Sequence, residues 1–137
     1  MTRTRTRRRG AFAAAALLAL AGGGCSGAER PAAAAATERG LWLGPIHLCR
    51  DAVAEASAGL DDIGVQPALR MMLAPAVQPR LQRATAARVG RTMAIRLDGR
   101  VLQAPRINEP LTGTALVLMG GSSEEVQTML AATRRPC

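Results

Sequence analysis

The sequence has 137 residues and a formal net charge of +8, and all 18 of its basic residues are arginine. Five of these arginines lie within the first ten residues, so the net charge beyond residue 24 is only +3, from 13 Arg against 10 acids. Proteins that bind nucleic acids usually keep a basic face and aromatic side chains that stack on bases. Because Phe12 and Trp42 are the only aromatic residues, the composition argues against nucleic-acid binding, and the length predicts a single domain.

Residues 1–24 have the order of an export signal peptide. Residues 1–10 are basic, residues 11–21 are apolar, and glycines then lead to Cys25. The apolar segment is shorter than the about 20 residues that span a bilayer. Two processing routes stay open: Cys25 is the lipidated cysteine of a bacterial lipoprotein, which we favour, or signal peptidase cleaves after Ala21. The first predicts a lipid anchor on the periplasmic side of the envelope, at the outer membrane rather than the inner one. The second predicts a secreted protein.

The three cysteines are an odd number for an exported protein. If Cys25 carries lipid, Cys49 and Cys137 remain as a pair at the two ends of the expected domain. An oxidising periplasm would let them form a disulfide, and closing so long a loop would stabilise the fold by about 4 kcal/mol. The alternative is two free thiols. No zinc site is expected, because Cys137 has no metal-ligating neighbours.

Residues 25–40 are rich in Ala, Gly and Pro, which predicts a disordered linker before a domain over residues 41–137. Residues 52–61 fit two structures, because Ala and Glu favour a helix whereas the period of two fits a strand. The alternation of residues 67–73 predicts a strand.

Residues 76–89 predict a helix. Pro79 is tolerated only in the first turn of a helix, and Gly90 is a typical residue just past a helix end. The residues that share one stripe at helical spacing are Val77, Leu81, Ala84 and Arg88.

Residues 94–104 predict a β-hairpin around Asp98 and Gly99. An Asp-Gly pair between two strand-like runs is typical of a type I′ turn, in which both central residues have positive φ. We therefore interpret Asp98 as structural rather than catalytic. Pro105 has no N–H and should end the pairing.

Residues 114–120 predict a strand and residues 122–135 a helix, in which Ser122 and Glu125 form a capping-box pattern. The residues expected on the inner face of this helix are Val126, Met129, Leu130 and Thr133. The sum of these elements is an α+β fold, an antiparallel sheet with two helices packed on one face.

The order of motifs resembles a known module, the first periplasmic domain of SecD, in its head subdomain. The resemblance rests on four sequence segments: a Gly after a helix, "AIRLDGRVLQAPRI", "EPLTG" and "GGSSEEV". The match spans roughly residues 50–135. SecD is an accessory subunit of the bacterial protein-export translocon. The resemblance implies a β-hairpin over residues 52–73, and we favour strand there on that ground. Leu81 and Ser122 stand where the family usually has Phe, and the membrane helices of SecD have no counterpart here.

Candidate catalytic groups are sparse. His47 is the only histidine and lies close to Cys49, but a surface histidine beside a structural disulfide is the preferred interpretation. Asp61 and Asp62 are adjacent, which suits capping in a turn better than acid–base pairing. The methionines are interpreted as core filler, with a Met-rich contact groove as the alternative. We expect no enzyme, cofactor or metal; a small hydrolase is kept only as a contrasting class.

The function expected from these observations is contact with a polypeptide or an envelope partner, accessory to protein export, with membrane attachment through lipid at Cys25. Translocon subunits are among the partners that the resemblance implies, and no small-molecule substrate is expected. The alternative is a structural or scaffolding envelope lipoprotein without a translocation role. The loops expected to contact the partner are the Asp98–Gly99 turn and the bend that contains Asn108, Glu109, Pro110, Thr112 and Gly113.

Overall fold

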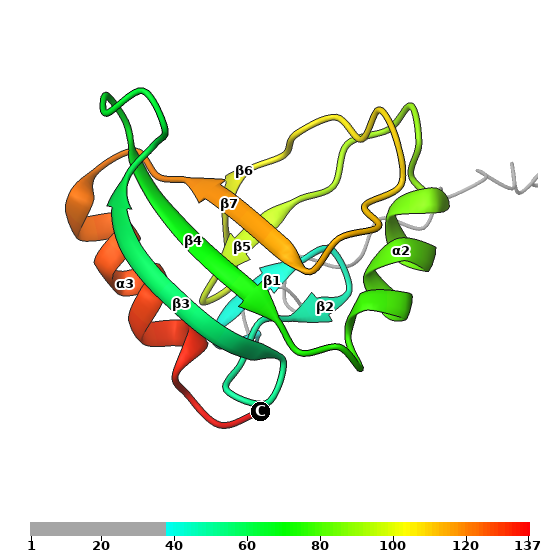
Figure 1. The fold of residues 1–137 in the computed structure, drawn as a ribbon, viewed down its shortest axis with the longest axis horizontal. Helices are drawn as coiled ribbons and strands as arrows, with labels where there is room; N and C mark the ends of the chain where they lie inside the picture. The colour runs from blue at the N-terminus through cyan, green and yellow to red at the C-terminus, as the bar shows by residue number, and fades with distance from the viewer. Residues whose placement is uncertain (1–37) are drawn as a thin grey trace, which may run out of the picture.

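The computed structural model describes residues 38–137, which form two antiparallel sheets and two helices (Figure 1). The expected signal peptide, Cys25 and most of the expected linker lie outside the described residues. The α+β class is confirmed. The strands, expected in one sheet, are divided between two, because the 94–104 hairpin pairs with the strand that starts at Leu41.

The first sheet has four short strands in the order β2-β1-β5-β6. Their bounds are Leu41–Leu43 for β1, Ile46–His47 for β2, Ile95–Leu97 for β5 and Arg100–Gln103 for β6. In β1 and β5 alternate residues are buried, as one-sided strands require. The predicted hairpin is confirmed, since β5 and β6 pair antiparallel on either side of Asp98 and Gly99.

The second sheet has three longer strands in the order β3-β4-β7. Their bounds are Val53–Leu60 for β3, Pro67–Leu73 for β4 and Ala115–Met119 for β7. The strand interpretation of residues 52–61 is confirmed against the local helix propensity. Pairing with β4 over the whole length of β3 decides the outcome, because tertiary context overrides a weak local preference.

Helix α3, Ser123–Thr133, packs across β3 and β4 on one face of the second sheet (Figure 1). Its start is capped as expected: the Ser122 hydroxyl accepts the Glu125 N–H at 3.1 Å. The Glu125 carboxylate accepts the N–H of Gly121 at 2.9 Å, one residue earlier than in the usual capping box. The four residues expected to face inward are all buried, so the helix prediction is confirmed.

Helix α2, Gln78–Ala86, follows β4 and begins with Pro79 in its first turn. It ends three residues earlier than predicted, so Arg88 lies in a turn outside the helix and is exposed; its place in the helical stripe was wrong. The chain leaves the helix because Val89 and Gly90 pair with Ile107, with the Gly90 N–H donating to the Ile107 carbonyl at 2.8 Å. Gly90 has φ +79°, which glycine adopts freely.

The core is built from aliphatic and sulfur-containing side chains rather than from aromatic ones. The largest fully buried hydrophobic residues are Leu41, Leu48, Leu69, Leu81, Met93, Met129 and Val126. Leu81, which occupies a position where the SecD pattern usually has Phe, is completely buried. Met93 and Met129 are 1% and 0% exposed and contribute flexible thioether side chains to this core.

Candidate functional site

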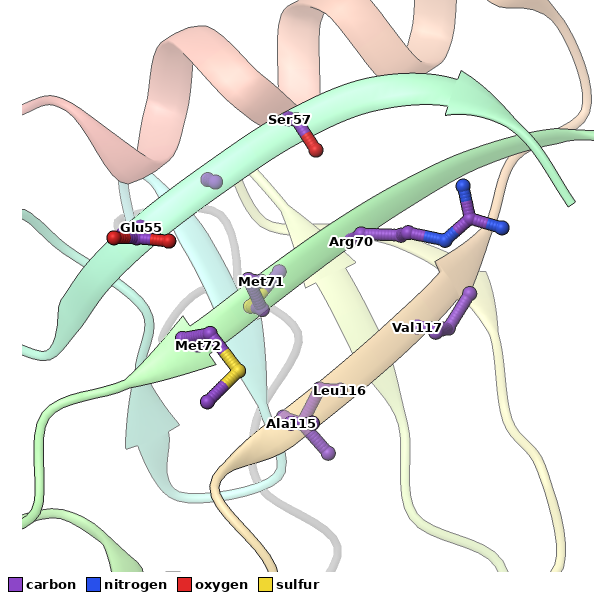
Figure 2. A pocket seen from close by; sticks show the side chains of 9 residues that line it. Glu55, Ser57, Arg70, Met71, Met72, Ala115, Leu116 and Val117 are labelled. Carbon is purple, nitrogen blue, oxygen red and sulfur yellow. The ribbon is translucent and has the colours of Figure 1, made fainter.

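The face of the β3-β4-β7 sheet opposite α3 is open, and it carries a hollow of about 580 Å³ (Figure 2). We call this hollow the sheet groove. Its lining residues are Glu55, Ala56, Ser57, Arg70, Met71, Met72, Ala115, Leu116 and Val117. The groove crosses all three strands, so each strand contributes side chains to it.

The strand register arranges the exposed side chains of the sheet groove in rows. Ser57 lies opposite Arg70, and Arg70 opposite Val117; Met72 pairs in the same way with Ala115 in the neighbouring row. Successive residues of a strand point to opposite faces. The residues between these rows therefore face α3 and the core, as the burial of Met71 and Leu116 shows.

The chemistry of the sheet groove is mixed. Met72 and Val117 leave 42% and 50% of their surfaces exposed, a large fraction for apolar side chains. Arg70 pairs with Asp62, in the loop after β3, at 2.5 Å, and Glu55 adds a carboxylate near the start of β3. An open apolar floor between opposite charges suits an extended chain better than an enclosed small molecule.

The described residues assemble no catalytic or metal-binding constellation. Within residues 38–137 no three His, Cys, Asp or Glu side chains lie together as metal ligands would. Ser57 lies beside Arg70 in the groove, whereas His47, the general base that a serine nucleophile would need, is held elsewhere. Its ring stacks on Trp42 with centroids 4.4 Å apart and planes 3° apart.

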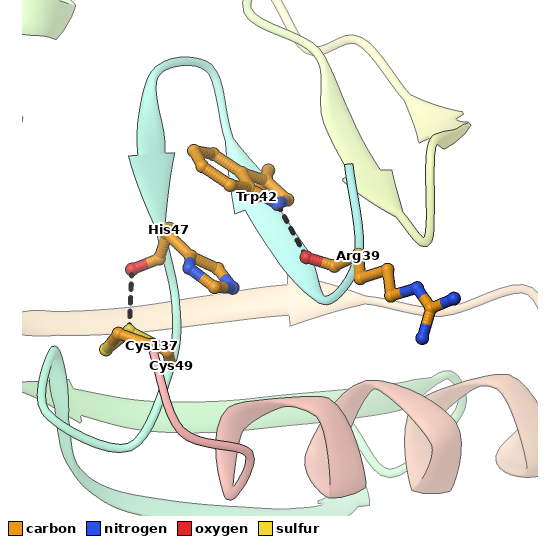
Figure 3. Close-up of a disulfide and its surroundings, with 5 residues drawn as sticks. All are labelled: Arg39, Trp42, His47, Cys49 and Cys137. Carbon is orange, nitrogen blue, oxygen red and sulfur yellow. Dashed lines mark hydrogen bonds between the residues drawn. A yellow bond between two sulfur atoms is a disulfide. The ribbon is translucent and has the colours of Figure 1, made fainter. Parts of the chain in front are cut away.

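His47 and Cys49 belong to a structural cluster at the end of the domain (Figure 3). Cys49 forms a disulfide with Cys137, with Cα atoms 5.2 Å apart, and so joins the turn before β3 to the chain after α3. The Trp42 indole N–H donates to the Arg39 carbonyl at 2.9 Å. Burial lowers the pKa of His47 below its ordinary 6.5. The "HLC" segment therefore does not form a free Cys–His pair.

The Asp98–Gly99 turn is tied into the fold. Both residues have positive φ, +48° and +82°, as a type I′ turn requires. The Asp98 carboxylate accepts the Gly40 N–H at 2.8 Å and pairs with Arg135 at 3.0 Å. The Gly40 N–H, with a smaller contribution from the Arg135 charge, lowers the pKa of Asp98. Since its carboxylate is already engaged, we leave this turn out of the contact surface proposed below.

The bend over residues 108–114 lies against α2 and leads into the sheet groove. Most of its residues are exposed, including Asn108, Glu109, Pro110, Thr112 and Gly113. The Gln78 side chain donates to the Thr112 carbonyl at 2.7 Å, and the Leu111 N–H donates to the hydroxyl of buried Thr85 at 3.0 Å. Two residues after Gly113 the chain reaches Ala115, which lines the groove.

Sequence reasoning found the bend but not the sheet groove as a set of residues. The methionines had suggested a contact groove as an alternative to core filling. Of the four methionines at positions 71, 72, 93 and 129, only Met72 is exposed in the groove, and the other three are buried. The alternation of residues 53–60, 67–73 and 115–119 could have marked an open face.

These features define an α+β domain with an open, partly apolar sheet face and no catalytic centre assembled among the described residues. The sequence model of the family "SecDF, P1 head subdomain" matches residues 34–135. The chain therefore belongs to the SecDF P1 head family, and the resemblance seen in the sequence is confirmed.

Two curated relatives agree with this assignment. The protein translocase subunit SecDF of Thermus thermophilus is 34% identical over 93 residues, which are 68% of this chain and 12% of that protein. The protein translocase subunit SecD of Acidaminococcus fermentans is 45% identical over 51 residues, 37% of this chain and 12% of that protein. The chain thus spans about an eighth of the length of the curated relatives it matches.

Two solved structures share the fold. One, described as "Structure and function of a membrane component SecDF that enhances protein export", superposes with a TM-score of 0.56 at 30% identity, over 66% of this chain and 44% of that chain. The other, SecDF in its "Super-membrane-facing form", gives a TM-score of 0.52 at 31% identity, over 62% of this chain and 12% of that chain. Among residues 38–137, neither helix is long and apolar enough to cross a bilayer.

Proposed function

We propose that this chain is an exported, lipid-anchored member of the SecDF P1 head family that contacts extended polypeptides outside the cytoplasm, as an accessory to protein export. The observation that carries the proposal is the sheet groove, with the exposed bend at its end. One solved relative is described as enhancing protein export, which supports placing the contact in that process. The proposed role is non-enzymatic.

The groove suits a partner whose sequence varies. Met72 and Val117 offer apolar surface without a closed pocket that would select one side chain. Glu55 adds a carboxylate at one side of that surface, and Arg70, which is paired with Asp62 but keeps 43% of its side chain exposed, lies at the other side (Figure 2), so a passing chain meets both signs of charge. The Cys49–Cys137 disulfide supports a location on the periplasmic side, where such bonds persist.

A photo-crosslinking residue at Met72, in the full chain and in cells that export pulse-labelled proteins, tests the contact. We expect Met72 to capture newly exported polypeptides and translocon subunits. The matched control is Val101, which is 55% exposed but lies on β6 of the other sheet. Equal capture from both positions would remove the groove from the proposal. Capture of envelope structural proteins alone would favour the scaffolding alternative.

The lipid anchor is tested separately. Cells that carry the full chain and are fed labelled palmitate should label it, and Cys25→Ala should abolish the label. An unlabelled natural chain cleaved after Ala21 would show the ordinary signal-peptide route instead, and a labelled Cys25→Ala chain would show that the lipid is not on Cys25.

A further inference from the structure

Strand β3 leaves one edge of its sheet open. It is the end strand of the order β3-β4-β7, it has eight residues, and Glu55 is its only charged residue. Natural edge strands are usually shortened, charged, broken by proline or bulged, because an open row of N–H and C=O groups pairs readily with another strand. One bulge lies at the start of β3, between Val53 and Glu55, and the rest of the strand pairs regularly with β4.

We propose that β3 pairs antiparallel with β3 of a second copy of this chain, about a two-fold axis near Ser57, to form a continuous six-stranded sheet. Such a contact is isologous, because each copy presents the same segment to the other. The small side chains at the centre of the strand, Ala56, Ser57 and Ala58, leave room for the second backbone to approach. This pairing does not depend on the proposed polypeptide contact.

The loop after β3 supports this partner rather than another. Ile63 and Val65 are 80% and 68% exposed at its tip, although large aliphatic side chains are usually covered. The loop is held in shape by Asp61, whose carboxylate accepts the N–H groups of Val65 and Gln66 at 2.7 and 3.2 Å. It therefore presents its apolar tip as a preformed surface.

Antiparallel pairing about Ser57 would bring this tip to the start of β3 in the second copy. A hollow of about 220 Å³ lies there, between β3 and the end of α3. Its lining residues are Arg50, Val53, Ala54, Glu55, Ala56, Thr133 and Arg134. The two-fold axis repeats this fit, so each copy would insert one tip and receive one.

Charge complementarity points to the same partner. Arg50 and Arg134 line the hollow, and within residues 38–137 neither guanidinium pairs with a carboxylate. Asp61 and Asp62 directly precede the apolar tip that would enter it; Asp62 pairs with Arg70 of its own chain, whereas among residues 38–137 no basic side chain forms an ion pair with Asp61. Asp51 follows Arg50 but does not line the hollow. A second copy thus brings the Asp61 carboxylate to the end of β3 at which Arg50 and Arg134 have no carboxylate partner, once on each side of the axis.

A photo-crosslinking residue at Ile63 tests the pairing in cells that express two differently tagged full-length copies. We expect a product that carries both tags, mapped by mass spectrometry to the segment from Arg50 to Ala54 or to Arg134. Val89, 46% exposed beside α2, is the matched control and should give no such product. Products that join Ile63 only to other proteins would overturn the proposal, and so would the absence of any product.

A substitution at the axis provides an independent test. Ser57→Lys places two like charges next to each other across the axis and should reduce the two-tag product about tenfold. Val101→Lys adds the same charge to β6, an edge strand of the other sheet, and should leave the yield unchanged. Circular dichroism confirms that both variants fold. A yield that Ser57→Lys leaves intact would contradict pairing through β3.

Discussion

Asp98 and Gly40 are joined by two hydrogen bonds, although they are 58 positions apart in the sequence. The Gly40 N–H donates to the Asp98 carboxylate at 2.8 Å, and the Asp98 N–H donates to the Gly40 carbonyl at 2.9 Å. Both residues have positive φ. This reciprocal pair fastens the hairpin turn to the segment that enters β1.

Replacing Asp98 should therefore weaken the fold. Asp98→Ala removes the acceptor for the Gly40 N–H and places a residue with low tolerance for positive φ in the turn, so the free energy of unfolding should fall by about 1–2 kcal/mol. Asp98→Asn should lower the free energy of unfolding by less, because Asn keeps an acceptor oxygen and tolerates this backbone region. Urea denaturation measures both. If the free energy of unfolding falls equally in the two variants, the Arg135 ion pair rather than the Gly40 hydrogen bond stabilises the turn.

Thr85 should be more sensitive than its small size suggests. Its buried hydroxyl donates to the Leu81 carbonyl at 2.8 Å and accepts the Leu111 N–H at 3.0 Å, which joins α2 to the bend. Thr85→Val keeps the shape but leaves the Leu111 N–H without its partner, and should cost about 1–3 kcal/mol.

The matched control is Thr128→Val in α3, where the exposed hydroxyl only donates to the Glu124 carbonyl within the helix. Its unfolding free energy should change by less than about 0.5 kcal/mol. Comparable effects in the two variants would exclude a special role for the Thr85–Leu111 contact.

The disulfide should contribute strongly to stability, because its cysteines are 88 residues apart. The double variant Cys49→Ser/Cys137→Ser should lose about 4–5 kcal/mol on the chain-entropy model. Thermal unfolding followed by circular dichroism, with and without reductant, measures this loss. Reductant should lower the midpoint of the natural chain to that of the double variant, which itself should not respond. A natural chain indifferent to reductant would mean that the two thiols are unpaired in solution.

His47 should make the fold less stable in mild acid. Burial lowers its pKa in the folded state below 6.5, so the unfolded chain binds more protons as the pH falls through about 6.5. The free energy of unfolding should therefore decrease between pH 7 and pH 5. His47→Phe keeps a ring against Trp42 without a titrating group, and its denaturation midpoint should be flat over this window. A natural chain that is equally flat there would contradict the prediction.

Local patterns predicted most of the elements. The Asp98–Gly99 turn follows from the backbone needs of two adjacent residues, and Ser122 and Glu125 marked the start of α3 in the same local way. Division of the strands into two sheets did not follow, because it depends on the distant pairing of Leu41 with Leu97. The early end of α2 had the same kind of cause, the pairing of Val89 with Ile107.

The candidate site was less predictable than the fold. Which methionine faces outward follows the alternation of β4, since Met71 shares a face with Leu69 and Leu73, and Met72 shares one with Arg70. That alternation does not show that the outer face is open and hollowed, because the groove is formed by three strands together. The turn at Asp98 looked like a free tip because its partner, Gly40, lies far away in the sequence. The exposed bend was found because Pro110 and Gly113 mark a loop without reference to any distant residue.

The stack of Trp42 on His47 has a practical consequence for solution studies. The chain contains one tryptophan and no tyrosine, so its intrinsic fluorescence arises from that indole, which is stacked on the His47 ring. Acid titration of the neighbouring imidazole should be directly visible in the emission. Trp42 does not line the sheet groove, so occupation of the groove is better followed with a dye attached there.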